Sequence, residues 1–191
     1  SWHVAFPTDH EVELLRSHGL LVSHNVQFHW RDDGYGDFVG FMAAFSAERR
    51  RKLRAERRRV AESGLRIEVR HGDEIDRGEW PTLHALYAST FDKYGNYAAF
   101  TAQCFADLAA ALGRRMVLFI ARADGVPVAL SICFRSADTL YGRYWGTSGN
   151  YHSLHFELCF YQGIDYCLRE GLAIFEPGAG GDYKQVRGFD A

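Results

Sequence analysis

Three apolar segments separated by two short turns constrain the fold of this chain more than any other feature. They cover residues 116–123, 128–134 and 140–147 and are rich in branched and aromatic side chains. The intervening sequences, DGVP and SADT, are typical of tight turns. Because connections this short join only antiparallel neighbours, the pattern predicts a three-stranded meander.

The flanking sequence predicts helices and further strands around this meander. Residues 65–71 alternate as a strand, and apolar residues recur at helical spacing in 78–95 and 101–113. The segment 154–170 is apolar almost all round, which is typical of a helix buried on a sheet, and 172–178 reads as a short strand. This order predicts an α/β (α+β) fold with a mixed, mainly antiparallel sheet flanked by helices.

The N-terminal sequence differs in character from the rest. Residues 10–19 read as a short helix that ends at a glycine, and residues 26–30 alternate as a half-buried strand. The sequence RDDGYGD that follows is typical of a turn or linker. We therefore expect a boundary there, with 1–36 as an N-terminal extension or the end of a preceding half and 37–191 as one domain.

Composition excludes a general attraction to nucleic acid or membranes, because the net charge is only −2 over 191 residues. One local cluster stands out at 49–59, which holds eight lysines and arginines. Arg50, Arg54 and Arg57 fall on one face of the predicted helix. Either this is a solvated helix that its own glutamates partly neutralise, or it is a phosphate-binding stripe for RNA or a nucleotide.

The sequence also bears on location and metal chemistry. It contains neither an apolar run long enough to span a bilayer nor a signal-like start, and its four cysteines are scattered. We therefore expect a cytoplasmic protein with free thiols and no membrane span. His152, His155 and Glu157 do not have the spacing of a zinc site, so no metal is expected. The oligomeric state is not set by any pattern in the sequence.

Polar residues at the ends of apolar elements are the candidates for binding. Arg143 and Tyr144 point to opposite faces of an aromatic strand, and Arg143 either pairs with a carboxylate such as Glu176 or binds an anionic substrate. His152, His155 and Glu157 surround the start of the next helix, where backbone N–H groups favour anions. The loop after residue 93 places Tyr94 beside other aromatic residues.

The glycine-rich segment 178–188 carries the second candidate group. Lys184 and Arg187 are three residues apart, so they share one face of a helical turn. They would form an anion or oxyanion clamp, or they are solvated charges on a capped loop. The Walker A lysine pattern and the GxSxG nucleophile elbow are both missing from the sequence.

Several of these motifs, in their order along the chain, resemble the FemAB-like family of the GNAT acyltransferase superfamily. The resemblance rests on QFHW at 27–30, RRRKLRAERR at 49–58, TFDKYGN at 90–96, LYGRYWG at 140–146, LHFELCFYQGIDYCLREGL at 154–172 and FEPGAGGDYKQVRGF at 175–189. It implies a GNAT-like fold. Family members are about twice as long, so it also implies a fragment of a longer two-half protein whose C-terminal sheet strands are missing.

Related Fem transferases add amino acids from aminoacyl-tRNA to the peptide amine of cell-wall precursors. The resemblance therefore implies that Arg50, Arg54 and Arg57 suit tRNA and that Lys184 suits an oxyanion or phosphate. Where the family has QGEHK, this chain has GGDYK, so Asp182 and Tyr183 replace an acid and a histidine. This counts against a histidine-based mechanism at that position. The glycine-rich loop of acetyl-CoA users is also missing before residue 154, which counts against ordinary acetyl-CoA use.

The first hypothesis is an N-acyltransferase of GNAT/Fem type that transfers an acyl or aminoacyl group to a small-molecule or peptide amine, such as a cell-wall precursor. The donor would be aminoacyl-tRNA or acyl-CoA, with no tightly bound cofactor. The expected catalytic residues are Lys184, Glu157 and His155, and the expected substrate-binding residues are Arg143, Tyr144, His152, Tyr94 and Arg187. The alternative is a non-catalytic GNAT-like module that binds peptide, cell-wall precursor or RNA. In a third interpretation, the basic helix only connects the two halves.

Overall fold

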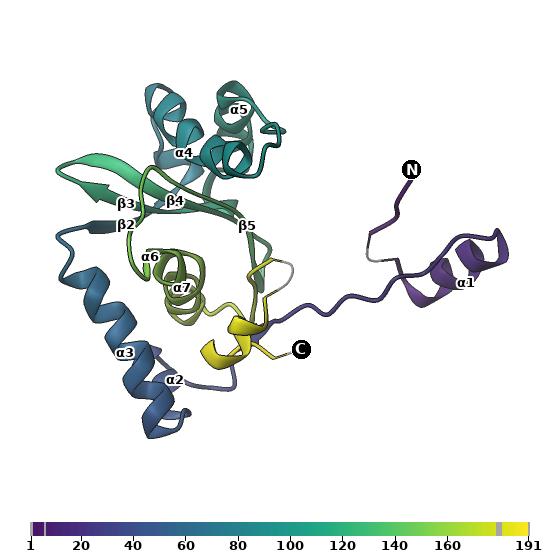
Figure 1. Ribbon diagram of the computed structural model, residues 1–191, viewed down its shortest axis with the longest axis horizontal. Coiled ribbons are helices and arrows are strands. Elements are labelled where there is room, and N and C mark those ends of the chain that lie inside the picture. The colour runs from purple at the N-terminus through teal and green to yellow at the C-terminus, as the bar shows by residue number, and fades with distance from the viewer. Residues whose placement is uncertain (1, 6, 179–180, 191) are drawn as a thin grey trace.

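The computed structural model describes residues 2–5, 7–178 and 181–190 and confirms the expected fold class. A six-stranded sheet with the order β1-β6-β5-β4-β3-β2 forms the centre of the molecule (Figure 1). All neighbours are antiparallel except β5 and β6. The strands are β1 (Trp30–Arg31), β2 (Arg66–His71), β3 (Met116–Ala123), β4 (Val126–Arg135), β5 (Thr139–Thr147) and β6 (Ile174–Glu176).

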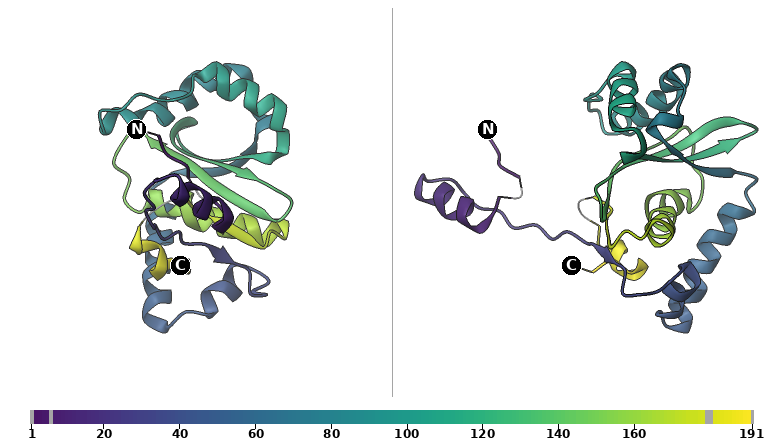
Figure 2. Two further views of the ribbon diagram at one scale, coloured as in Figure 1. Left: turned by 90° about the vertical axis from the view of Figure 1, so that its right-hand side faces the viewer. Right: turned by 180° about the vertical axis from the view of Figure 1, so that it is seen from behind.

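Helices cover both faces of the sheet (Figures 1 and 2). One face carries α4 (Trp80–Lys93) and α5 (Ala102–Leu112), and the Thr101 hydroxyl caps the start of α5 by accepting a hydrogen bond from the backbone N–H of Cys104. The other face carries one long helix made of α6, η4 and α7, with α2 and α3 outside it. Their bounds are α2 (Phe38–Ala43), α3 (Ala47–Ala61), α6 (Leu154–Phe156), the π-helical η4 (Glu157–Tyr161) and α7 (Gln162–Glu170).

Each face of the sheet has its own hydrophobic core. Leu118, Ile120 and Ile132 pack against α4 and α5, while Val117 and Phe119 pack toward α7. This is the alternation expected of strands buried on both faces. The two layers of helices therefore fix the position of the central strands, and through them the ends of β5 and β6.

Strand β5 is held closely against α4. A side chain at Gly146 would collide with the backbone carbonyl of Leu86, so glycine is required there. The hydroxyl groups of Ser89 and Thr90 donate hydrogen bonds to backbone oxygens of β5. The backbone of α4 therefore occupies the space beside the strand at Gly146.

Residues on the N-terminal side of the expected boundary at residue 37 also pack against the sheet. Phe28 and Trp30 are only 5% and 1% exposed, and β1 pairs with β6 at the end of the sheet. The expected strand 26–30 contributes only its last residue to β1, and Val26 is exposed. Asp32 accepts hydrogen bonds from two backbone N–H groups of the expected linker, which is therefore an ordered turn between β1 and α2.

Residues before this point form an arm that leaves the body. The helix α1 (Asp9–Ser17) stands apart from the sheet and its helices (Figures 1 and 2). Thr8 and Glu11 form a reciprocal capping box at its start. None of its nine residues is buried. In the described parts of the chain, no helix combines the length and apolar character that crossing a bilayer requires.

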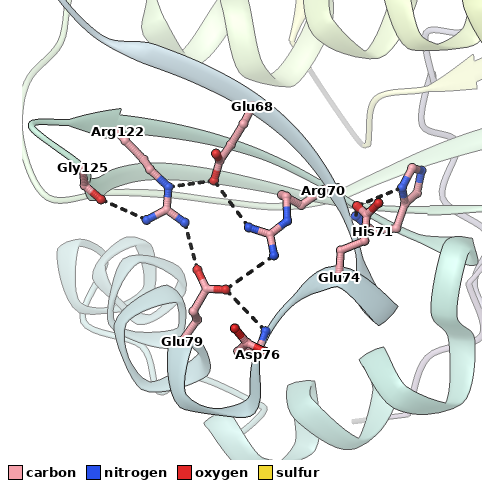
Figure 3. Close-up of polar contacts among 8 residues, drawn as sticks. All are labelled: Glu68, Arg70, His71, Glu74, Asp76, Glu79, Arg122 and Gly125. Carbon is pink, nitrogen blue, oxygen red and sulfur yellow. Dashed lines mark hydrogen bonds and ion pairs between the residues drawn. The ribbon is translucent and has the colours of Figure 1, made fainter.

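A network of charged side chains ties β2 and β3 to the start of α4 (Figure 3). Arg122 donates to Glu68 at 2.7 Å, to Glu79 at 2.9 Å and to the carbonyl of Gly125 at 3.1 Å. Arg70 completes the network 3.6 Å from Glu79. Glu79 ends the short helix η2 (Arg77–Glu79), so the network connects the sheet to the layer of helices that covers it.

Candidate active site

The parallel strands β5 and β6 diverge at one end of the sheet, and the candidate site lies where they separate. Pairing between β5 and β6 covers only Thr139 to Tyr141 on β5, whereas β5 continues to Thr147. At Gly142 the chain that follows β6 still lies close, because a Cβ there would be 3.2 Å from the Cα of Pro177. Beyond it the two segments separate, and η5 (Asp182–Arg187) follows the diverging chain.

Lys184 is the buried cation of this site. Its residue is 2% exposed, and its Nζ donates a 2.6 Å hydrogen bond to the carbonyl oxygen of Gly178. Burial lowers the pKa of this ammonium group, because desolvation disfavours the charged form. The hydrogen bond holds the side chain across the glycine-rich turn, at the end of β6.

His155 lies on the same side of the sheet within an aromatic cluster. Its ring is 5.2 Å from that of Trp145, 5.5 Å from that of Phe160 and 6.5 Å from that of Tyr183. Burial, together with the positive charges of Arg187 and Lys184, lowers the pKa of His155 from 6.5 to about 4. The imidazole is therefore neutral near pH 7, a hydrogen-bonding group and not a cation.

The loop after α4 approaches this cluster. Burial raises the pKa of Tyr183, and Cys159 and Tyr94 contribute smaller rises. Tyr94 itself is 70% exposed. The structure thus gathers Lys184, His155, Trp145 and Tyr183 at one end of the sheet, whereas the ring of Tyr94 lies beside Lys93.

Arg187 does not form the expected clamp with Lys184. It is 3% exposed and donates to both carboxylate oxygens of Glu56, at 2.7 and 3.3 Å. It also donates to the Tyr161 hydroxyl at 3.2 Å, and its guanidinium lies 3.5 Å from the centre of the Phe156 ring. Because a buried guanidinium needs a counter-charge, its donors are used within the protein, and Arg187 fastens η5 to α3.

Glu157, which was expected to be catalytic, is also paired within the protein. Arg57 donates to its two carboxylate oxygens at 3.1 and 3.2 Å, and Gln162 donates at 2.8 Å. The residue is 3% exposed and lies between α3 and the buried helix. Two expectations are corrected by this pairing. Glu157, expected to be catalytic, accepts hydrogen bonds from Arg57 and Gln162, and Arg57, expected to contact phosphate, uses its donors on Glu157.

The remaining candidates on β5 and near α6 are separated from one another. Arg143 pairs with Glu176 at 3.1 Å, which was one of its two expected roles. Tyr144 packs against Tyr87 on the α4 side of the sheet, with ring centres 5.0 Å apart, whereas Trp145 packs with the α7 side. His152 is exposed and lies 2.7 Å from the Ser153 hydroxyl.

The basic helix is divided between structural and exposed arginines. Arg50 donates to the carbonyl oxygens of Ala43 and Phe45 and so closes the end of α2. Arg54 is exposed, and within the described residues the structure gives it no hydrogen bond or ion pair. A groove of about 550 Å³ lies beside it. The groove is lined by Phe38, Val39, Met42, Arg54, Arg57, Arg58, Val60, Ala61, Leu65, Ile67, Glu157 and Gln162.

Glu56 is the residue of the site region that sequence reasoning missed. In the sequence it was one of the glutamates expected to neutralise part of the basic helix. In the structure Glu56 is 5% exposed and accepts hydrogen bonds from Arg187. A signal was present, because Leu53, Glu56 and Val60 share the buried face of α3. In the parts of the chain that the structure describes, His, Cys, Asp and Glu residues form no group of three that could hold a metal ion.

Several proteins of known structure share this fold. The structure resembles FemX with a TM-score of 0.64 at 12% identity, covering 95% of this chain and 66% of that one. It resembles L-PGS from Bacillus licheniformis with a TM-score of 0.61 at 13% identity, covering 89% and 50%. A conserved protein of unknown function from Bacteroides thetaiotaomicron VPI-5482 gives 0.53 at 11% identity, covering 94% and 62%.

These identities show a shared fold, and the chain spans less than two thirds of the length of each of the three proteins. No curated protein sequence matches it significantly. The family comparison is more specific, because the model of the FemAB-like family, described as peptidoglycan biosynthesis/recognition, matches residues 1–191. The resemblance seen in the sequence motifs is thereby confirmed, and the chain belongs to the FemAB-like family.

Proposed function

We propose that this chain is part of a transferase that moves an acyl or aminoacyl group from a thioester or ester donor to an amine. The observation that carries the proposal is the buried Lys184 ammonium beside the neutral His155 ring, at the point where β5 and β6 diverge. Membership in the FemAB-like family and the likeness to FemX support it. The reaction would take place on the side of the sheet that carries Trp145 and Tyr183.

The chemistry requires few groups from the protein. The acceptor nitrogen attacks the donor carbonyl carbon, and a C–N bond forms as the C–O or C–S bond of the donor breaks. Negative charge develops first on the carbonyl oxygen and then on the leaving oxygen or sulfur, which takes up the proton released by the amine. A buried ammonium stabilises such charge strongly, because water does not screen it. Lys184 would serve this role, and the neutral His155 ring would accept a hydrogen bond from the amine.

The donor in this proposal is aminoacyl-tRNA, with acyl-CoA as the other candidate, and the acceptor is a peptide or small-molecule amine such as a cell-wall precursor. The exposed Arg54 and its neighbour Arg58 support a contact with the phosphates of tRNA. Arg50 and Arg57 would contribute less, because their donors are already used within the protein.

The test is transfer of a radiolabelled group from aminoacyl-tRNA or acetyl-CoA to an amine acceptor by the purified chain. Replacing Lys184 with Ala should lower the rate roughly hundredfold or more, as loss of an oxyanion-stabilising donor does. Lys184→Arg, which keeps the charge, should retain more activity. The matched control is Lys52→Ala, which removes an exposed lysine from α3 and should change nothing.

Two outcomes would count against the proposal. If Lys184→Ala loses activity only in proportion to its loss of folded protein, the lysine is structural. If the chain binds a donor or a cell-wall peptide tightly but transfers nothing to any amine, the binding-module hypothesis replaces it. Binding of tRNA that weakens steeply with salt, and less steeply after Arg54→Ala, would identify the donor.

A further inference from the structure

The end of η5 next to Lys184 is bound by an arginine of the basic helix α3. The Nε of Arg49 donates a 2.9 Å hydrogen bond to the carbonyl oxygen of Val186, and a terminal nitrogen donates to the carbonyl oxygen of Gln185. The guanidinium also lies 4.8 Å from the centre of the Phe45 ring. The last carbonyl groups of a helix lack partners within that helix, and a planar guanidinium with several donors suits them. Arg49 therefore caps the carbonyl end of η5.

The position of Arg49 on α3 is not explained by α3 itself. The hydroxyl of Ser46 accepts a 3.3 Å hydrogen bond from the backbone N–H of Arg49, which places Arg49 in the first turn of the helix. A cation is unfavourable there, because the N-terminal end of a helix carries partial positive charge. The carbonyl oxygens of η5 carry the opposite partial charge and offset this cost. The contacts of Arg49 thus indicate a role toward η5.

The same face of α3 binds η5 a second time. Arg49 and Glu56 are seven residues apart and lie on one side of the helix, and Glu56 accepts a 2.7 Å hydrogen bond from Arg187. The residue that follows η5 is also closely packed, since a Cβ at Gly188 would lie 2.8 Å from the Phe45 ring. This end of η5 is therefore fixed by two arginines and by close packing.

We propose that Arg49 is a positioning residue for Lys184, and that the basic helix holds the Lys184 ammonium at the place where β5 and β6 diverge. The catalytic part of this inference rests on the proposed function. Arg49 acts through η5 and is not expected to touch the reacting groups. Without its cap, the end of η5 gains freedom, and the 2.6 Å hydrogen bond from Lys184 Nζ to the carbonyl of Gly178 loosens. Arg49 thus belongs to the framework of the site and not to an RNA-binding surface.

The state of Lys184 can be measured without any assay of activity. The sequence contains three lysines, which are Lys52, Lys93 and Lys184. Lysine labelled with carbon-13 at Cε therefore gives three NMR signals, and the Lys184→Arg variant identifies the signal of Lys184. Burial lowers the pKa of this ammonium, so its titration reports how closely it is enclosed. The groups that interact electrostatically with it are Cys159, Glu176 and His155.

The decisive variant is Arg49→Ala. It should raise the pKa of Lys184 toward that of a solvated lysine, because a loosened ammonium becomes hydrated. It should also lower kcat roughly tenfold without changing KM, as displacement of a catalytic group does. Arg49→Lys keeps a cation that can reach one carbonyl and should restore part of both effects. The matched control is Arg51→Ala, which removes the same charge from an exposed position of α3 and should leave the Lys184 titration unchanged.

Contrary results are clearly defined. If Arg49 only contacted the RNA of the donor, Arg49→Ala would raise KM for aminoacyl-tRNA and reduce the salt dependence of binding, with kcat and the Lys184 signal unchanged. That result would overturn the proposal, and so would an equal shift in Arg51→Ala. Should the alanine variant fail to fold, Arg49→Gln keeps one donor and is titrated instead, with a smaller rise expected. A wild-type chain that transfers nothing would refute the proposed function, whereas the Lys184 titration would still decide whether Arg49 positions it.

Discussion

Two arginine–glutamate clusters in this molecule use the same chemistry in different surroundings. In the inner cluster, Arg187 and Glu56 have side chains only 4% and 7% exposed, and Tyr161 donates a further hydrogen bond to the carboxylate. In the outer cluster, Arg122 bridges Glu68 and Glu79, whose side chains are 16%, 17% and 27% exposed (Figure 3). The difference is access to water.

Burial changes what each cluster does. Water and salt can replace the partners of the outer cluster, so its removal should lower the free energy of unfolding only slightly. The outer cluster connects the edge of the sheet formed by β2 and β3 to the start of α4. The inner cluster has no such replacement, because removing one partner leaves a buried charge. It also fastens η5, which carries Lys184, to α3. The site region therefore depends on the inner cluster and not on the outer one.

The largest expected effect is the loss of Arg187. Arg187→Ala should lower the free energy of unfolding by about 3–5 kcal/mol, because it leaves the Glu56 carboxylate buried without its counter-charge. Urea denaturation followed by tryptophan fluorescence measures this. Glu56→Leu combined with Arg187→Met should be less damaging than the single change. If Arg187→Ala costs no more than Arg122→Ala, the distinction between the clusters is wrong.

The second prediction uses the burial of His155 near Arg187 and Lys184. Burial, with Arg187 and Lys184, lowers the pKa of His155 from 6.5 to about 4, so between these values the unfolded chain binds the proton more readily. The free energy of unfolding should therefore fall as pH drops below about 6.5 and should lose on the order of 2–3 kcal/mol by pH 4.

Denaturation curves from pH 4 to 8 check this prediction. His155→Phe should flatten the part of the pH dependence that lies between about 4 and 6.5. His152→Phe, which replaces an exposed histidine three residues away, should leave the curve unchanged. Identical curves for wild type and His155→Phe would show that the site does not suppress protonation of His155.

The third prediction concerns an intermediate case. Arg57 is 31% exposed but its partner Glu157 only 4%, so the pair is buried on one side. Arg57→Ala should cost about 2 kcal/mol, because Gln162 alone then satisfies the carboxylate. Thermal unfolding measures the loss, and Glu157→Gln in the same background should recover part of it. A loss of about 3–5 kcal/mol in the free energy of unfolding would show that this pair behaves like the buried Arg187–Glu56 pair.

The smallest effect is expected at the sheet edge. Arg122→Met should cost about 1 kcal/mol or less, since its partners remain within reach of water. The loss should shrink further in 1 M NaCl, whereas the cost of Arg187→Ala should hardly change, because salt screens only the exposed pairs. Parallel denaturation of both variants at low and high salt would show whether burial is the property that separates the clusters.

Local patterns predicted most of the secondary structure. The meander, the helices α4, α5 and α7 and the short β6 follow from apolar spacing and turn residues, which are properties of neighbouring residues in the sequence. The same patterns brought Lys184, His155 and Tyr94 forward as site candidates, since each ends or follows an apolar element. The two-residue strand β1 could not be placed from local patterns, because it gains its position only from its partner β6.

The sequence by itself determined the order of the elements and the kinds of charge near their ends. Only the tertiary structure decided which charges pair. Glu56 and Arg187 are 131 residues apart and Arg57 and Glu157 are 100 apart, so no local spacing reveals either pair. The physical reason is that a buried charge must find its partner wherever packing places one. Arg187, Glu157 and Arg57 therefore form ion pairs that stabilise the fold. Lys184 and His155 lie where β5 and β6 diverge.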